Sequence, residues 1–219
     1  MIRLIIVRHG NTFESGQTPV QVGLKTDLPL TEKGCLQAEY FAKYLEVKNI
    51  KPKAVYAGSL KRQVKTAQIV CKYLHIQDAL KLNEPALNEI DYGLWEGLST
   101  EDIQSKWPDD YANWTEESRW ADGIFAQSLG HHIKAIQSWI KQLLQTYKAN
   151  DCIIGVTSNG IMRLFQTFQT TQWQQLVHDR NMEKIKVKTG HFCDLLIDDD
   201  GSVQIQSWNV NPQDYLKDV

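Results

Sequence analysis

The residues best suited to chemistry follow a short apolar run near the amino terminus. Residues 4–7, Leu-Ile-Ile-Val, lead directly into Arg8, His9 and Gly10. A neutral imidazole can attack phosphorus at physiological pH, and arginine binds phosphate through two parallel hydrogen bonds. A strand that delivers an arginine and a histidine to one sheet edge therefore indicates phosphoryl chemistry, with His9 as the nucleophile.

Phosphoryl transfer also needs a second cation and an acid for the departing alcohol. Arg62 lies in the first turn of an expected helix that follows a short strand, which could bring it near Arg8. Its position in the sequence alone, however, favours a solvent-exposed arginine on the helix surface. Glu89 is the candidate acid because desolvation near a cleft raises a carboxyl pKa, and Asp91 and Glu96 are its rivals in the same loop.

The apolar patterns predict strands and helices that alternate along the chain. Strands are expected at 4–7, 54–57 and 152–157, helices at 31–45, 60–74, 129–147 and 161–168, and an antiparallel pair at 192–197 and 202–208. This order predicts an α/β fold, a three-layer α/β/α sandwich with a mostly parallel central sheet. Its ligand site is expected at the carboxyl ends of the strands.

Length and composition favour one folded domain over residues 1–219, with a cap or insertion at about 99–127. Hydrophobic residues make up 42% of the chain and charged residues 23%, which are ordinary values for a globular protein. Within the insertion, Trp107, Trp114 and Trp120 stand among many carboxylates. They could line a cap over the site or be buried in a core, and the pattern leaves both open.

Net charge, cysteine spacing and the first apolar run bear on the partners and the location of the protein. A formal net charge of -2 provides no broad basic field, so neither nucleic acid nor an anionic membrane is expected as a partner. The four cysteines are scattered without zinc or redox spacing and are interpreted as reduced packing residues. The first apolar run is too short for a signal peptide or a membrane span, so a cytoplasmic location is expected. The oligomeric state is left open.

Four motifs occur in an order that resembles the histidine phosphatase superfamily, also called the phosphoglycerate mutase-like family. They are RHGNT, TDLPLTEKGCLQA, YAGSLKRQVKTA and LNEIDYGLWEG. The family counterparts are RHG[ED]T, D-x-P-L-T-x-x-G-x-x-Q-A, S-x-L-x-R-x-x-x-T-A and L-x-E-x-x-x-G-x-W-E-G. The resemblance covers nearly the whole chain and implies a phosphoglycerate mutase-like fold.

The resemblance also implies residue roles. His9 would be the phosphorylated residue, Arg8 and Arg62 would bind the phosphate, and Glu89 would donate the proton. The partner would be a small phosphorylated substrate, and no metal or organic cofactor is implied.

The chain departs from the family pattern after the strand expected at 152–157. Ser158 stands where the family has a second histidine, and Asn159 stands where it usually has a glycine. Both are expected to line the phosphate pocket with Asn11 and Thr12, which match family neighbours of the nucleophile. Loss of one preorganised donor typically costs ~10²–10³ in rate, although a serine hydroxyl can restore part of it. We therefore expect reduced activity, and Gly58, where the family often has serine, is a further departure.

Other histidines are weaker replacements for the missing one. His191 precedes a strand at the expected site end of the sheet and is the best of them, although even it is not favoured. His131 and His132 are adjacent on a helix, where neighbouring side chains point about 100° apart. Both are expected to face solvent.

Three functions compete on these grounds. The favoured one is a phosphatase, a phosphomonoesterase with a phosphohistidine on His9. The alternatives are phosphoglycerate mutase-type phosphotransfer and a non-catalytic phosphate-ligand-binding pseudoenzyme. A serine hydrolase built on Ser158 is disfavoured, because Gly155 and Gly160 give G-x-x-S-x-G and not the G-x-S-x-G of a tight nucleophile elbow.

Overall fold

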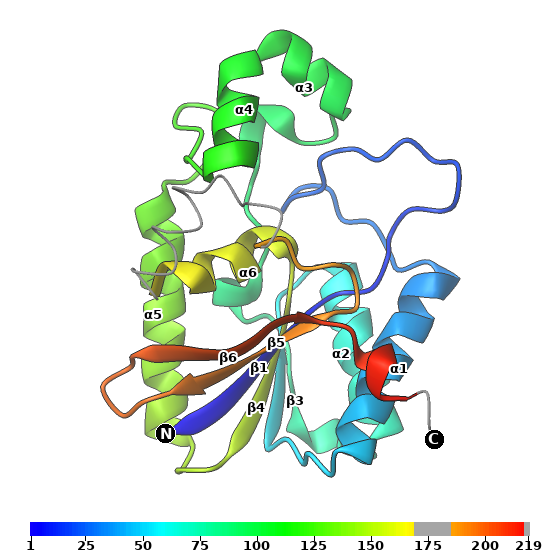
Figure 1. Ribbon diagram of the computed structural model, residues 1–219, viewed down its shortest axis with the longest axis vertical. Helices are drawn as coiled ribbons and strands as arrows, with labels where there is room; N and C mark the ends of the chain where they lie inside the picture. Colours follow the sequence, from blue (N-terminus) through cyan, green and yellow to red (C-terminus); the bar gives the residue numbers. More distant parts are fainter. Residues whose placement is uncertain (169–184, 217–219) are drawn as a thin grey trace.

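A computed structural model describes residues 1–168 and 185–216 and shows a central sheet between helical layers (Figure 1). The sheet order is β3-β2-β4-β1-β5-β6. The strands are β1 (Ile2–Arg8), β2 (Ala54–Ala57), β3 (Leu80–Lys81), β4 (Cys152–Thr157), β5 (Phe192–Ile197) and β6 (Val203–Val210). Strands β3, β2, β4 and β1 pair in parallel, and β5 and β6 complete the sheet by antiparallel pairing. The predicted fold class is confirmed.

Helices cover both faces of the sheet (Figure 1). They are α1 (Glu32–Val47), α2 (Lys61–Tyr73), α3 (Thr100–Lys106), α4 (Pro108–Glu117), α5 (Leu129–Thr146) and α6 (Asn159–Phe165). On one face, Phe41 and Leu45 of α1 join Val70 of α2 in a buried apolar cluster. On the other, Trp139 of α5 and Phe165 of α6 belong to a second cluster. Burial of apolar surface on both faces explains why the central strands are continuous apolar runs.

The predicted elements agree closely with the observed ones. The ranges of β2, β4 and β5 match the prediction, and Thr31 caps α1 by accepting the Gly34 N–H at 3.1 Å. The edge strand β3 was missed because two residues carry no alternation. The helix expected at 161–168 begins earlier, at Asn159, and changes into a 3₁₀ turn over Gln166–Phe168.

The tryptophan-rich insertion contributes to the core. Trp114 and Trp120 are buried, and the Phe125 ring lies 5.1 Å from each of them in an edge-to-face arrangement. Helices α3 and α4 lie beyond the carboxyl ends of the parallel strands, at the top of Figure 1. Burial in a core, one of the two alternatives left open, is therefore correct for Trp114 and Trp120, whereas Trp107 is only partly buried against the same cluster. A cap over the site remains a prediction.

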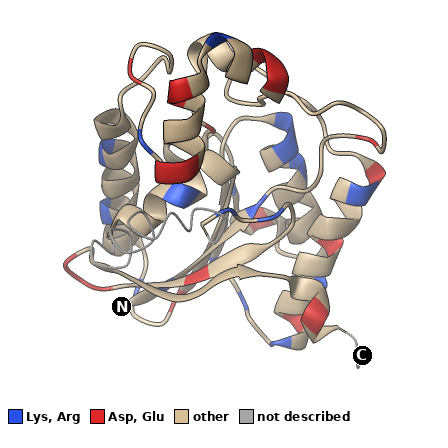
Figure 2. Cartoon of the chain, turned by 45° about the horizontal axis from the view of Figure 1, so that its top comes forward, with Lys and Arg blue, Asp and Glu red and all other residues tan. Residues whose placement is uncertain are grey.

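Two findings bear on membranes and metals. Over residues 1–168 and 185–216, no helix is long and apolar enough to cross a membrane. Within the same described ranges, no group of three or more His, Cys, Asp or Glu side chains is placed to hold a metal ion. Figure 2 shows basic and acidic residues mixed over the helices and loops, in keeping with the small net charge.

Candidate active site

His9 follows the last residue of β1 and is 5% exposed. Its backbone continues the sheet, because its N–H donates to Thr157 O at 3.0 Å. Its Nδ1 lies 2.7 Å from Gly10 O, a carbonyl that can only accept, so Nδ1 carries the proton and Nε2 carries the lone pair. Burial, reinforced by the Arg62 and Arg8 charges, lowers the pKa of His9 well below its ordinary value. The ring is therefore neutral at physiological pH.

Arg62 is fully buried at 0% exposure, and its Nε donates to His9 Nε2 at 3.1 Å. Its two terminal nitrogens donate to Thr26 O at 2.9 Å and to Gly23 O at 3.0 Å. The solvated position favoured by spacing alone is therefore wrong. Spacing could not reveal the acceptors, because they belong to a loop that precedes α1.

Glu96 holds that loop in place from the other side. Its carboxylate accepts hydrogen bonds from Gly23 N at 3.1 Å, from Lys25 N at 3.2 Å and from the Thr26 hydroxyl at 2.5 Å. The same two residues, Gly23 and Thr26, present their carbonyls to Arg62. Glu96 therefore positions Arg62 through the loop, and nothing in its hydrogen bonding supports its rival assignment as the acid.

Arg8 is held from a different part of the chain. One terminal nitrogen donates to Val187 O at 2.6 Å, and Val187 N in turn donates to Asn159 Oδ1 at 2.9 Å. Desolvation lowers the pKa of Arg8, which nevertheless stays charged. Among the described residues, the Arg8 Nε–H is buried without a hydrogen-bond partner. An anion bound beside His9 would satisfy it.

Glu89 is buried, with 5% of its surface exposed. Its two oxygens accept from Ile90 N at 2.9 Å and from Gly160 N at 3.2 Å. Desolvation raises the pKa of Glu89, and the two N–H groups and the Arg62 and Arg8 charges oppose that rise. A Cβ on Gly160 would overlap the Glu89 and Tyr92 side chains, so only glycine lets this carboxyl reach the start of α6.

The glycines of the first two motifs have a shared explanation. A Cβ on Gly10 would overlap the backbone of Gly34, and a Cβ on Gly34 would overlap the backbone of Asn11. The chain after β1 thus crosses the first turn of α1 in direct backbone contact. The absence of a side chain at Gly10 therefore makes room for the backbone of α1.

The remaining predicted phosphate-binding residues have protein partners. Asn11 donates from Nδ2 to Phe13 O at 2.5 Å, and Thr12 lines a hollow formed by the loop before α1. Asn159 accepts from Val187 N, so it supports the segment that holds Arg8. Ser158 is 0% exposed and accepts a hydrogen bond from Gln63. The assignment of these four residues to phosphate binding remains a prediction.

The three histidines considered as replacements for the second histidine of the family have other surroundings. His191 lies beside β1, because its carbonyl accepts the Arg8 N–H at 2.9 Å, but its ring Nδ1 is 3.1 Å from Asn209 O of β6. His132 is 7% exposed, and its ring lies 5.4 Å from that of Trp120, so its expected exposure to solvent is wrong. Burial lowers the pKa of His132 to about 4. His131 is exposed, as expected.

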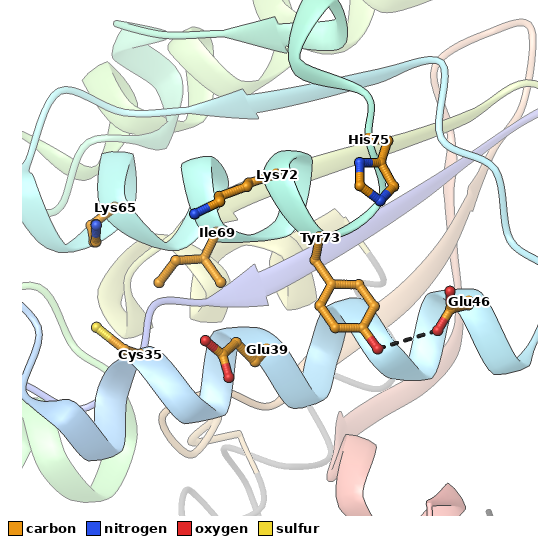
Figure 3. A pocket seen from close by; sticks show the side chains of 8 residues that line it. All are labelled: Cys35, Glu39, Glu46, Lys65, Ile69, Lys72, Tyr73 and His75. Atoms are coloured by element: carbon orange, nitrogen blue, oxygen red, sulfur yellow. Dashed lines mark hydrogen bonds between the residues drawn. The ribbon is translucent and has the colours of Figure 1, made fainter.

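A large surface hollow lies well apart from these residues, between α1 and α2 (Figure 3). Its volume is about 610 Å³, and its lining includes Glu39, Glu46, Lys65 and Lys72. Acids on α1 face bases on α2, an arrangement typical of a solvated helix pair. The hollow does not contain His9 or any of the side chains placed around it.

Comparison with known proteins identifies the class. The sequence model of the histidine phosphatase superfamily (branch 1) matches residues 4–211. The chain belongs to this superfamily. The class predicted from the sequence, a phosphoric monoester hydrolase of the histidine phosphatase type, is thereby confirmed.

Three known proteins illustrate what the chain is similar to. Phosphoserine phosphatase 1 of Hydrogenobacter thermophilus is 28% identical over 74% of each chain. A 2,3-bisphosphoglycerate-dependent phosphoglycerate mutase of Bartonella henselae is 35% identical, over 48% of this chain and 50% of the mutase. The structure of a mycobacterial glucosyl-3-phosphoglycerate phosphatase superposes with a TM-score of 0.77 at 20% identity, over 95% of this chain and 99% of that chain.

The roles of Gln63 and Glu96 were not predicted from the sequence. Gln63 directly follows Arg62 and was hidden among the variable positions of its motif. Glu96 was considered only as an acid, although its position beside Gly97 in the fourth motif was the available signal. In both cases the contacts join segments far apart in the chain, which spacing does not reveal.

Proposed function

We propose that the chain is a phosphomonoesterase that hydrolyses a small phosphorylated metabolite through a phosphohistidine at Nε2 of His9. The observation that carries this proposal is the tautomer of the buried ring. Gly10 O binds Nδ1–H, and burial keeps the ring neutral, so Nε2 is the available nucleophile. Arg62 already lies beside that atom.

The reaction has two steps, transfer of the phosphoryl group to His9 and hydrolysis of the phosphohistidine. In the first, Nε2 attacks phosphorus, the bond to the alcohol oxygen breaks, and Glu89 gives its proton to that oxygen. In the second, water attacks the phosphohistidine, the P–N bond breaks, and the Glu89 carboxylate takes the proton of the water. Inorganic phosphate leaves, and both side chains return to their starting states.

Substrate binding requires local exchange of hydrogen bonds. The Arg62 Nε–H that now contacts His9 would turn to a phosphoryl oxygen, which leaves Nε2 free to attack. The unpartnered Arg8 Nε–H would bind another oxygen. Two guanidinium groups neutralise the charge that builds on the equatorial oxygens in the transition state.

The substrate class rests on the relatives. Their names refer to phosphoserine, phosphoglycerate and glucosyl-3-phosphoglycerate. All three are organic phosphates of modest size, which supports a metabolite and not a phosphoprotein. Mutase-type transfer is a second candidate, favoured by the higher identity of the mutases over about half of this chain.

The test is hydrolysis of para-nitrophenyl phosphate and a panel of phosphorylated metabolites that includes phosphoserine and both monophosphoglycerates. We expect release of inorganic phosphate that is lost in His9→Ala and kept in His131→Ala, a matched change at an exposed histidine. Equal turnover by the wild type and His9→Ala would refute the proposal. Interconversion of the phosphoglycerates without phosphate release would establish the mutase. Tight phosphate binding without turnover would establish a pseudoenzyme.

A further inference from the structure

Gln63 is a buried polar side chain on α2 that the proposed reaction does not use. Its amide nitrogen donates to Leu87 O at 2.8 Å and to Ser158 Oγ at 2.9 Å. The Leu87 carbonyl can only accept, so it fixes which end of the amide is the nitrogen. Both N–H groups of Gln63 are therefore used, and the Ser158 oxygen is the acceptor of one of them.

Ser158 keeps its own hydroxyl proton for another partner, because a hydroxyl both donates and accepts. In the described part of the chain, the hydrogen bonds provide no protein acceptor for this proton. Ser158 directly follows β4, which pairs with β1, the strand that leads to His9. Two residues after Ser158, the Gly160 N–H donates to Glu89. Ser158 therefore lies at the same end of the central strands as the proposed nucleophile and acid.

Gly58 makes room for the Gln63 amide. A Cβ at this position would overlap Gln63 Oε1 and the Asn88 side-chain oxygen. A serine there, which the family often carries, would require the ends of the Gln63 and Asn88 side chains to move. Gln63 Oε1 is itself buried without a partner among the described residues, a costly arrangement that needs a compensating gain. Both departures, at 58 and at 158, therefore lie against the Gln63 amide.

We propose that Gln63 and Ser158 together replace the second histidine of the family. Ser158 donates its hydroxyl proton to a phosphoryl oxygen, and Gln63 is the positioning residue that holds the Ser158 oxygen so that the proton turns toward the phosphate. The replacement also puts a group that does not ionise near neutral pH in the position of one that does. This inference rests on the proposed function, because it assigns a donor to the same reaction.

The first test compares Ser158→Ala, Gln63→Ala and the double variant, with Gln68→Ala on the exposed face of α2 as the control. Loss of one preorganised donor lowers kcat about 100-fold. We expect this loss in each single variant and no further loss in the double, because Gln63 acts through Ser158. Full activity in Ser158→Ala, or losses that multiply in the double variant, would overturn the proposal.

The second test restores the family residue. Ser158→His combined with Gln63→Ala should recover part of the activity lost in Ser158→Ala and add a pH dependence near neutrality that the wild type lacks. That new ionisation is a readout that a purely structural role for Gln63 would not produce. An unchanged pH profile in an active double variant would contradict the assignment of residue 158 to the phosphate.

The third test does not depend on turnover. Gly58→Ser should lower the Tm in the wild-type background and lower it less when Gln63→Ala has removed the amide. Titration with inorganic phosphate should show weaker binding in Ser158→Ala. If the wild type binds phosphate without hydrolysing esters and Ser158→Ala binds it more weakly, the proposed function fails while the donor assignment stands. If phosphate binding is equal in the wild type and Ser158→Ala, the donor assignment fails.

Discussion

The two central strands, β1 and β4, end in different kinds of surroundings. At the end of β1, the Gly10 carbonyl holds the His9 ring. Arg62 of α2, which contacts that ring, is held by the carbonyls of Gly23 and Thr26. After β4, Ser158 is held by the side chain of Gln63. The β1 end matches the family motifs, whereas the β4 end departs from them.

This difference shows which parts of a site tolerate change. Backbone acceptors do not depend on residue identity, so the β1 end keeps its geometry as long as the motif glycines and the loop persist. A contact between two side chains depends on both residues, as that of Gln63 with Ser158 does. We therefore expect substitutions at the β1 end to act singly and those at the β4 end to be coupled.

The largest effect is expected at Glu89, which binds the start of α6 after β4. Glu89→Gln cannot donate a proton, so hydrolysis of alkyl phosphates should fall ~10²–10⁴-fold. An aryl phosphate has a better leaving group, so its first-turnover burst should survive in rapid-mixing measurements. Glu101→Gln, an exposed carboxylate on α3, is the control. Equal loss of the alkyl reaction and the aryl burst would show that Glu89 is not the acid.

Arg62→Lys tests the β1 end. Lysine cannot reproduce the three donors that Arg62 directs at His9, Thr26 and Gly23. We expect kcat/KM to fall ~10²–10³-fold, with Lys65→Arg on the same helix as the control. Combination with Ser158→Ala should multiply the two losses, because the two ends act independently. A double variant no worse than Arg62→Lys alone would disprove that independence.

Glu96→Gln should have a smaller effect, because Glu96 acts through the loop. In the wild type, donors from Gly23, Lys25 and Thr26 share the two oxygens of the Glu96 carboxylate. The glutamine side chain would leave them one acceptor oxygen. Misplacement of Arg62 should lower kcat/KM ~10- to 100-fold. Loss of charged hydrogen bonds should cost about 1–2 kcal/mol of unfolding free energy in urea titrations. Unchanged kinetics would mean that the loop does not position Arg62.

The smallest effect is a pH dependence of stability from His9. The folded-state pKa lies well below the ordinary 6.5, so below pH 6.5 the unfolded state binds a proton that the folded state does not. The contribution of His9 to stability should therefore be constant above that pH and fall below it, by at most about 1.4 kcal/mol per pH unit. His9→Asn should lack this contribution in urea titrations between pH 5 and 8. Identical slopes in both proteins would show that the pKa of His9 is not lowered.

The sequence predicted the parts of the site that follow strand ends. His9 and Ser158 were expected on one edge because β1 and β4 are apolar runs, and the structure pairs those strands directly. Burial of Arg62 and Glu89 was not predictable, since it depends on the loop at Gly23 and on the start of α6. Periodicity reports one element at a time, whereas these contacts join three or more.

Direct detection of the phosphorylated histidine tests the central claim. Wild-type protein mixed with para-nitrophenyl phosphate and quenched within one turnover should gain one acid-labile phosphoryl group, located at His9 by mass spectrometry of peptides. Its ³¹P signal should show attachment at Nε2, because Gly10 O holds Nδ1. Unmodified protein during measurable turnover, or a phosphoryl group on another residue, would contradict the account.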